Sequence, residues 1–346
     1  MDEFETWFDK GVTDGLPVVP PSRERVEAML AATRRARDEL LGEMPPSYGR
    51  VTVEKAAINA VMAGCRPEYL PVLLAAAECA CDPAFNLHGV ATSTHFSAPL
   101  IVVHGPVRAR IGINSSFGVF GPGYRANATI GRALRLLMIN VGGAKPGGIS
   151  MSTFGHPGRY TYCIGEHEEA SPWVPYHVSR GLAAGSSAVT LFAGEAPHGV
   201  YDHMSRTARD LLITISKSLE VISHHKSTHH GDTVVVLSPE HAHTVAGDGW
   251  GKAEMREFLW ARLRKPVREL IPGVDGGEGL PAHVLAKFPR PETDGTLIAK
   301  FREPGNLKFV VAGGTAGRFS AVIPGWTFPK SSRMIWRKIH LPEETP

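Results

Sequence analysis

The sequence predicts an α/β protein in two parts: a helix-rich N-terminal domain with a small sheet over residues 1–181, and a βαβ domain with a parallel sheet over residues 182–346. Three observations support this organisation. The first third of the chain carries alanine-rich helical patterns. The second half alternates short apolar runs with amphipathic segments, which is typical of βαβ units. The length of 346 residues is also enough for two hydrophobic cores.

Local signals place the helices of the N-terminal part. Three prolines exclude a helix from residues 14–21. Ser22 and Thr52 are typical N-cap residues, and Gly64 is the residue type that ends a helix. We expect helices from Ser22 to about Leu41, from Thr52 to Gly64, and from Arg66 to about Cys81. Residues 99–113, rich in β-branched side chains, predict a strand or hairpin.

A glycine-rich loop over residues 118–132 leads directly into an apolar helix at 133–140. Exposed N–H groups and the helix dipole at such a junction favour an anion, and nearby arginines would add charge-assisted hydrogen bonds. A turn-rich connection with a helix cap explains the pattern equally well. The residues expected to bind an anionic substrate here are Arg125, Asn127, Thr129 and Arg132.

The segment 141–181 has no clear periodicity, and irregular segments of this length in a compact domain are usually functional. Beyond it, apolar runs at 188–192, 233–237 and 309–312 predict three strands of a parallel sheet, and residues 206–222 and 252–263 predict helices between them. The Pro- and Gly-rich segment 264–300 is expected to be an insertion or a long connection.

Ligands of an open parallel sheet bind at the carboxyl ends of its strands. If the three strands are neighbours, their following loops converge and bring together Glu195, His198, Glu240, His241, His243, Gly313, Gly314, Gly317 and Arg318. We expect His241 or His243 to act as acid or base, Glu240 or Glu195 to orient it, and the glycine-rich turn with Arg318 to hold an anionic group. The alternative is that the histidines bond backbone groups at a strand end.

Six of the 16 histidines fall between His224 and His243. His225 and His229 are four residues apart, a spacing that places both on one helix face and suits a divalent metal. However, Lys226 lies between them, and the segment leads into the amino end of a strand. A solvated loop or an inter-subunit contact is the alternative.

Cys65 is a candidate thiol nucleophile. It follows Gly64 at the expected start of a helix, beside Arg66, and both features lower a thiol pKa. A buried, inert cysteine between alanine-rich helices is the alternative.

The bulk composition excludes several classes of protein. A net charge of +3 is too small for a nucleic-acid binder. No apolar run reaches the roughly 18 residues of a membrane helix. The acidic start, Met1-Asp2-Glu3, is unlike a secretory signal, so we expect a cytoplasmic protein. We also expect a homo-oligomer.

Several strings resemble a poorly characterised bacterial family, often labelled thiol–disulfide-related, whose members are associated with small UGSC-motif proteins containing selenocysteine or cysteine. The resembling strings include Asp14-Gly-Leu-Pro-Val-Val-Pro-Pro, Ala126-Asn-Ala-Thr-Ile-Gly-Arg-Ala and Leu237-Ser-Pro-Glu-His-Ala-His. The resemblance spans nearly the whole chain and implies a bacterial metabolic role and a small thiol or selenol protein as partner. The Ser-Cys end of the motif is absent here, so a redox nucleophile of that type would belong to the partner.

The sequence therefore predicts a metabolic enzyme that acts on a small anionic metabolite. Histidine acid–base chemistry, with or without a divalent metal, would carry out an elimination or a hydrolysis. One alternative is a subunit of a two-component thiol- or selenol-dependent redox system, in which Cys65 matters more than the histidines. Another alternative is a metal-binding protein.

Overall fold

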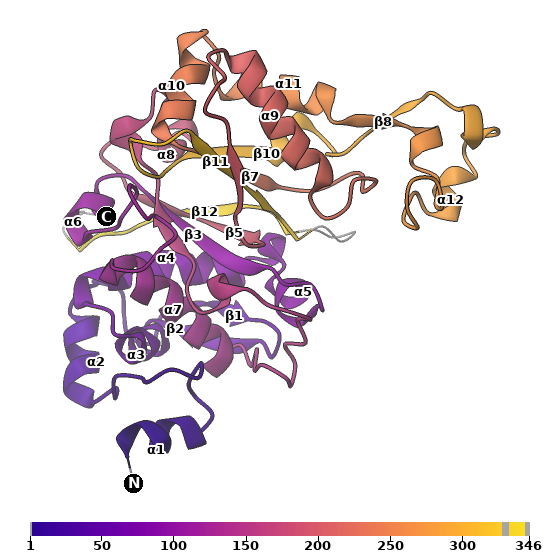
Figure 1. Ribbon diagram of the computed structural model, residues 1–346. Coiled ribbons are helices and arrows are strands. Elements are labelled where there is room, and N and C mark those ends of the chain that lie inside the picture. Colours follow the sequence, from indigo (N-terminus) through magenta and orange to yellow (C-terminus); the bar gives the residue numbers. More distant parts are fainter. Residues whose placement is uncertain (1, 327–331, 343–346) are drawn as a thin grey trace.

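The computed structural model describes residues 2–326 and 332–342, and it confirms the α/β class. Its secondary structure forms four layers: helices, a four-stranded sheet, a second four-stranded sheet, and further helices (Figure 1). One hydrophobic cluster lies between each pair of adjacent layers. Both sheets are therefore covered on both faces.

The helix starts in the first half of the chain follow the local signals, but two expected elements are wrong in extent. The helix expected from Ser22 to about Leu41 ends at Leu30, and the strand β1 begins at Leu40; the expected strand or hairpin at 99–113 ends at His104, and residues 107–111 form the helix α6. The side chain of Ser22 caps α2, that of Thr52 caps α3, and Gly64 ends α3 in the left-handed conformation. The elements are α1 (Glu3–Asp9), α2 (Arg23–Leu30), β1 (Leu40–Met44), β2 (Gly49–Thr52), α3 (Val53–Ala63), η1 (Pro67–Tyr69), α4 (Leu70–Cys81), η2 (Pro83–Phe85), α5 (Leu87–Thr92), β3 (Ala98–His104), α6 (Val107–Ile111), α7 (Arg125–Asn140), η3 (Pro157–Arg159), β4 (Cys163–Gly165), η4 (Glu168–Ala170) and α8 (Tyr176–Ser179).

The second half contains the expected alternation of strands and helices, with additional short strands. Its elements are β5 (Ala188–Gly194), β6 (His198–Tyr201), α9 (Ala208–Val221), β7 (Thr233–Leu237), α10 (Pro239–Gly247), α11 (Lys252–Arg262), β8 (Arg264–Pro266), η5 (Val267–Glu269), α12 (Ala282–Leu285), η6 (Pro291–Thr293), β9 (Leu297–Ala299), η7 (Pro304–Asn306), β10 (Leu307–Val311), β11 (Phe319–Pro324) and β12 (Ile335–Lys338).

The two main sheets have the strand orders β12-β5-β3-β4 and β10-β7-β11-β6. In the first sheet β3 is parallel to β4 and antiparallel to β5. In the second sheet β7 and β10 are parallel neighbours, as expected, but β11 pairs antiparallel to β7 on its other side. Both sheets are therefore mixed rather than parallel.

The expected placement of residues 188–192 beside 233–237 and 309–312 is wrong. These residues form β5, which pairs with β3 in the other sheet. All seven residues of β5 are buried, so its pattern suits a central strand of either sheet and does not specify a partner. Because β5 and β12 both belong to the sheet of the N-terminal helices, a division at residue 182 does not separate the two sheets.

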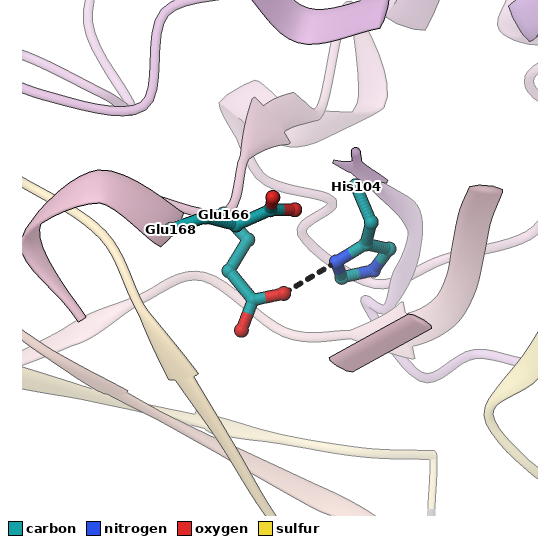
Figure 2. A group of neighbouring side chains, drawn as sticks. All are labelled: His104, Glu166 and Glu168. Atoms are coloured by element: carbon teal, nitrogen blue, oxygen red, sulfur yellow. Dashed lines mark hydrogen bonds and ion pairs between the residues drawn. The ribbon is translucent and has the colours of Figure 1, made fainter. Parts of the chain in front are cut away.

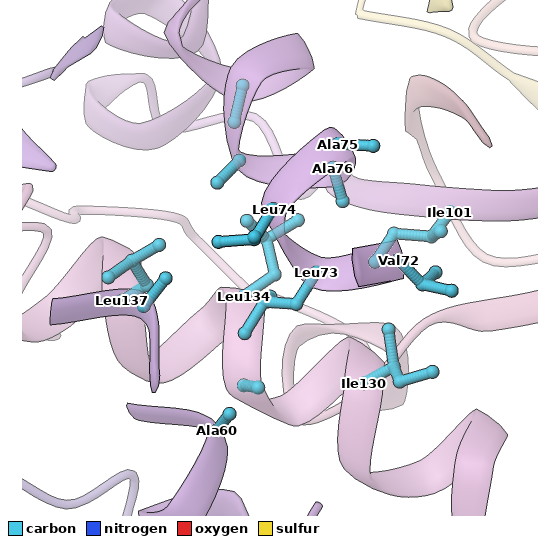
Figure 3. Packing of buried hydrophobic residues seen from close by; sticks show 14 of the residues in the cluster. Ala60, Val72, Leu73, Leu74, Ala75, Ala76, Ile101, Ile130, Leu134 and Leu137 are labelled. Atoms are coloured by element: carbon cyan, nitrogen blue, oxygen red, sulfur yellow. The ribbon is translucent and has the colours of Figure 1, made fainter. Parts of the chain in front are cut away.

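The core of the N-terminal half lies between the first sheet and the helices α3, α4 and α7. Figure 3 shows leucines of α4 close to leucines of α7, with Ala60 of α3 on one side of them and Ala75 and Ala76 of α4 on the other. Small side chains let these helices approach closely. Gly131 likewise lets α7 approach the segment before β4 closely, because a Cβ atom at this position would lie 2.4 Å from the hydroxyl of Thr161. Close packing here brings α7 against the irregular segment that precedes β4.

Residues 264–300 form an arm that extends from the second sheet's helices and carries β8, β9 and α12 (Figure 1). Two buried ammonium groups hold its base. Lys226 donates to the carbonyls of Ile271, Gly276 and Glu278, and Lys300 donates to carbonyls of the segment 220–224. Within the described residues, no helix is long and apolar enough to cross a membrane.

Candidate functional site

The histidines after β7 lie on a helix, not in a loop. The Ser238 side chain caps α10, and Pro239 occupies its first turn. His241 is buried: its Nδ1 lies 2.7 Å from the Ser320 hydroxyl, and its Nε2 lies 3.1 Å from the carbonyl oxygen of Asp202. Burial lowers the pKa of His241. Both ring nitrogens are therefore occupied by internal partners, while His243 is exposed.

The expected convergence of the strand ends does not occur. Gly194, the last residue of β5, forms a β-bridge with Gly325. The residue before Gly325, Pro324 of β11, pairs with Thr233. Thr233 begins β7, so Glu195 lies at the amino end of β7, whereas His241 follows its carboxyl end. His198 lies in β6 with an exposed side chain. Glu240 instead approaches Arg318, with 3.4 Å between Oε2 and Nε.

The residues expected to bind an anion around the start of α7 contact other parts of the protein. Arg132 makes a bidentate ion pair with Asp14, and the buried amide of Asn127 bonds backbone groups of Asn114 and Cys163. Arg125 donates to the carbonyl of Gly64 and accepts a bond from Thr129 at its own carbonyl. These contacts hold the helix in place, which matches the alternative interpretation.

The glycine-rich turn after β10 is also used internally. The Gly313 N–H donates to the carbonyl of Ser115, and its own carbonyl lies 3.1 Å from Nδ1 of His167. A Cβ atom on Gly314 would collide with the ring of Phe117. Gly317 has a left-handed conformation, and Arg318 donates to the carbonyl of Ser205. The turn thus joins the two sheets through residues 115–117 and 167.

His225 and His229 do not share a helix face, because residues 222–232 form no helix. Nε2 of His225 contacts the carbonyl of Asp275, and the His229 carbonyl accepts a bond from Arg302. Among the described residues, the grouping of metal-ligating side chains is found elsewhere, at His104, Glu166 and Glu168.

Burial raises the pKa of the Cys65 thiol to about 12. A thiol with this pKa is not ionised near neutral pH, and the thiolate is the reactive form. The structure therefore favours the inert cysteine over the nucleophile.

The cluster at the carboxyl ends of β3 and β4, which we call the His104 cluster, consists of His104, Glu166, Glu168, His177 and Lys252. Nδ1 of His104 lies 2.7 Å from Oε2 of Glu166, and both side chains are fully buried. Glu168 Oε1 accepts a bond from the N–H of Gly105 and lies 3.6 Å from Nδ1 of His177. Figure 2 shows both glutamate side chains directed toward the His104 ring.

Burial opposes the charge of the Glu166 carboxylate, but its contacts overcome this penalty. The hydrogen bond and charge of His104, together with Lys252 and the N–H of Tyr176, hold the pKa of Glu166 at about 2. One nitrogen and two carboxylate oxygens suit a transition metal. In the described part of the chain, Glu166 Oε1 and His177 Nδ1 are buried without a hydrogen-bond partner, so the cluster has unused ligand capacity.

A cavity of about 620 Å³ lies at the opposite end of β3, between α7 and the irregular segment 146–160. We call it the arginine cavity, because Arg135 and Arg159 both line it. Arg159 donates to Ser150 and to the carbonyl of His95, while its buried Nε has no partner among the described residues. Burial, then the charge of Arg159, lowers the pKa of Arg135 to about 10. At this pKa the Arg135 guanidinium is charged at neutral pH, and burial also lowers the pKa of Arg159.

A histidine–glutamate pair lies behind the wall of this cavity, because the lining residues Ser152 and Arg159 both donate to the carbonyl of His95. Nε2 of His95 lies 3.0 Å from Oε1 of Glu195, and each side chain retains 14% exposure. His95 Nδ1 accepts the N–H of Ser97, so Nε2 carries the proton that faces Glu195. The ring of His156 lines both the arginine cavity and a neighbouring cavity of about 360 Å³, and its Nε2 contacts the carbonyl of Gly194.

Of the predicted site residues, His225 lines a cavity of about 260 Å³ together with Glu220 and Lys265, and Asn127 lines the cavity of about 360 Å³. Glu195 forms an ion pair with His95 close to the arginine cavity. The carboxyl-end rule applied to β3 and β4 would have found the His104 cluster, because His104 ends one strand and Glu166-His167-Glu168-Glu169 follows the other. The parallel pairing of these strands was not visible in the sequence. Comparison with known proteins finds no match to this chain among family models, curated proteins or solved structures.

Proposed function

We propose that the protein is a metabolic enzyme that binds a small anionic metabolite in the arginine cavity. The observation that carries this proposal is that Arg135 and Arg159 face one cavity and form no ion pair with a carboxylate among the described residues. Two like charges in a partly buried site repel each other, and burial adds a cost for each. An anion with a carboxylate or phosphate group would relieve both effects.

The size and lining of the cavity favour a small polar ligand. The Ser152 hydroxyl and the phenol of Tyr160 line it beside the two arginines, and Phe154 provides an apolar face at its rim. Planar guanidinium groups bind carboxylate and phosphate groups bidentately, so they would fix the orientation of the ligand as well as its charge. Asp14, the carboxylate on the same wall, is occupied by Arg132.

Glu195 is the proposed base. Its carboxylate is held by His95, and the Tyr162 hydroxyl donates to its carbonyl, which fixes the backbone. In an elimination, Glu195 would take a proton from the carbon beside the anionic group and return it to the leaving oxygen. In a hydrolysis, it would take the proton of the attacking water. The imidazole of His95 stabilises the carboxylate in the orientation that either step needs.

Ligand binding tests the first half of the proposal. Inorganic phosphate and a series of small mono- and dicarboxylates are titrated into the protein by calorimetry. We expect Arg135→Met and Arg159→Met each to raise the dissociation constant of the most tightly bound anion about tenfold, since a charge-assisted hydrogen bond contributes about 1.5–3 kcal/mol. Arg209→Met, on the exposed face of α9, is the matched control. An equal loss in the control, or no binding of any anion, contradicts the proposal.

Turnover tests the second half. Once an anion that binds is identified, its conversion is followed by NMR with the wild type and with Glu195→Gln. The glutamine variant keeps the size of the side chain and a contact to His95 but removes the base. It should bind the anion normally and convert it at least a hundredfold more slowly, at about the contribution of one general base. Full turnover in this variant would exclude Glu195 as the base.

The redox alternative lacks support from the thiols of this chain. Burial raises the pKa of Cys65, Cys79 and Cys81 to about 12 and that of Cys163 further. A thiol or selenol would have to come from a partner. The metal-binding alternative is favoured by a specific observation, the His104 cluster, and is developed below.

A further inference from the structure

We propose that the His104 cluster binds one divalent transition-metal ion, with His104, Glu166 and Glu168 as protein ligands. Ligand atoms of these three residues all lie within 4.8 Å of one another. His104 ends β3, and Glu166 and Glu168 lie in the segment that directly follows β4, its parallel neighbour, so the backbone holds them together. This site was not indicated by the histidine run at 224–230.

The first supporting observation is unsatisfied polarity in a closed environment. Glu166 Oε1 and His177 Nδ1 are buried without a hydrogen-bond partner in the described part of the chain, and the two side chains are 0% and 1% exposed. Buried polar atoms without partners are rare in proteins because each carries a desolvation cost. A cation between the two glutamates would satisfy Glu166, and His177 lies next to Glu168 as a further donor.

The second observation is the orientation of the His104 ring. Its Nε2 lies 3.1 Å from the Thr190 hydroxyl, and its Nδ1 faces the carboxylates. A histidine that binds a metal through one ring nitrogen commonly donates the N–H of the other to a neighbouring acceptor, which fixes the orientation and the tautomer of the ring. Thr190 is placed to be such an acceptor for Nε2–H once a metal ion has replaced the proton that Nδ1 donates to Glu166.

The charges in and around the cluster leave room for a cation. Three carboxylates, of Glu166, Glu168 and Glu169, face Arg108, Lys252 and the His104 imidazole, whose single charge a divalent ion would replace. Arg108 binds Glu169 and Oε2 of Glu168 from the outer side. Lys252 approaches Oε1 of Glu166 to 3.5 Å, but its buried Nζ forms no hydrogen bond with the described residues. Lys252 is therefore a weakly held competitor for the position of the ion.

The donor set indicates the type of metal. Calcium and magnesium prefer oxygen ligands throughout, whereas an imidazole with two carboxylates suits zinc, manganese or iron.

The position of the His104 cluster separates it from the arginine cavity. His104 and Ala98 lie at opposite ends of β3, about 20 Å apart for six steps of about 3.3 Å. The ion would tie β3, the turn after β4 and α8 together, and would not contact a ligand in the arginine cavity.

Metal analysis of the purified full-length protein tests the site. The protein is prepared without chelator and analysed by mass spectrometry of its elements, then stripped and titrated with Zn²⁺ and Mn²⁺ by calorimetry. We expect one ion per chain. Glu168→Gln should weaken binding by about tenfold or more, the usual effect of losing a ligand or its support. Glu169→Gln is the matched control, because Glu169 contacts the same arginine but lies outside the ligand group.

The affinity of Lys252→Met for metal distinguishes a metal site from a metal-free network of ion pairs, even if a variant that lacks one of the ligands fails to fold. If Lys252 competes with the ion for Glu166, its removal should tighten metal binding at least severalfold. A folded wild type that carries no metal after purification and binds neither ion at about 1 mM, with Lys252→Met equally inert, would overturn the proposal. Neither result depends on anion binding or turnover, so it does not bear on the function of the arginine cavity.

Discussion

Nδ1 of His241 lies 2.7 Å from the hydroxyl of Ser320, and this contact joins the first turn of α10 to the strand β11. The partner strand was not expected from the sequence, and its presence converts a candidate catalytic histidine into a buried connection between helix and sheet. The Asp202 carbonyl occupies the other ring nitrogen. The most promising histidine of the sequence thus has its hydrogen-bonding capacity used within the fold.

His241→Ala should lower stability rather than remove an activity. The substitution leaves Ser320 and the Asp202 carbonyl without a partner and opens a cavity in a buried site, which together cost about 2–4 kcal/mol. Urea unfolding measures the loss. His243→Ala, two residues further along the same helix and exposed, is the control and should change stability by less than about 0.5 kcal/mol. Equal stability of the two variants would contradict the assigned role of His241.

His230 should make the fold sensitive to mild acid. Burial, then the charges of Lys300 and Arg302, lowers its pKa from 6.5 to about 3. Between these two pH values the unfolded chain binds a proton at His230 that the folded protein does not bind. The free energy of unfolding therefore has its full value above about pH 6.5 and falls as the pH drops toward 3. The expected loss between pH 7 and pH 5 is about 2 kcal/mol.

Urea unfolding at both pH values checks this expectation with His230→Gln, which cannot take up the proton. That variant should lose the contribution of His230, whereas His229→Gln, the exposed neighbour, should keep the wild-type dependence. A wild-type dependence in His230→Gln would show that another group is responsible.

Arg132→Met should separate the structural arginine of α7 from the proposed ligand-binding ones. Arg132 makes two bonds to the nearly buried carboxylate of Asp14, at 2.8 and 2.9 Å, and its loss leaves that charge without a partner. We expect a destabilisation of about 3 kcal/mol, measured by urea unfolding. The unpaired Asp14 carboxylate lines the arginine cavity and would itself repel an anion, so affinity is compared in the double variant Asp14→Asn/Arg132→Met, which has no free charge there. At a temperature where this variant is folded, anion affinity should stay within about twofold of the wild type, and a tenfold loss would place Arg132 in the binding site.

Gly131→Ala should destabilise the protein although alanine favours helices. The new Cβ atom would lie 2.4 Å from the Thr161 hydroxyl and 2.6 Å from the N–H of Tyr162, so α7 must move away from the segment before β4. The expected cost is about 1–3 kcal/mol. Gly247→Ala at the end of α10, where no atom lies within 4 Å of the new Cβ, should be neutral or stabilising by up to about 1 kcal/mol. Thermal unfolding of the two variants compares them directly.

The sequence by itself determined the features that depend on neighbours in the chain. Ser22, Thr52 and Gly64 bound their helices as expected, because a cap is a bond to a backbone group a few residues away. The α/β class and the parallel pair β7 and β10 followed from the alternation of buried runs with helices. Ser238-Pro239-Glu240 is also an N-cap signal of this kind, and it begins α10 where a loop is expected.

Only the tertiary structure decided which strands are partners and which side chains meet. β5 is buried on both faces, a pattern that suits a central strand of either sheet, and only the packing of the whole chain selects β3 as its neighbour. His104 and Glu166 are 62 residues apart, and the pairing of β3 with β4 brings them together. Local patterns carry no information about such contacts, because their free energy comes from burial and charge in an environment that distant segments create.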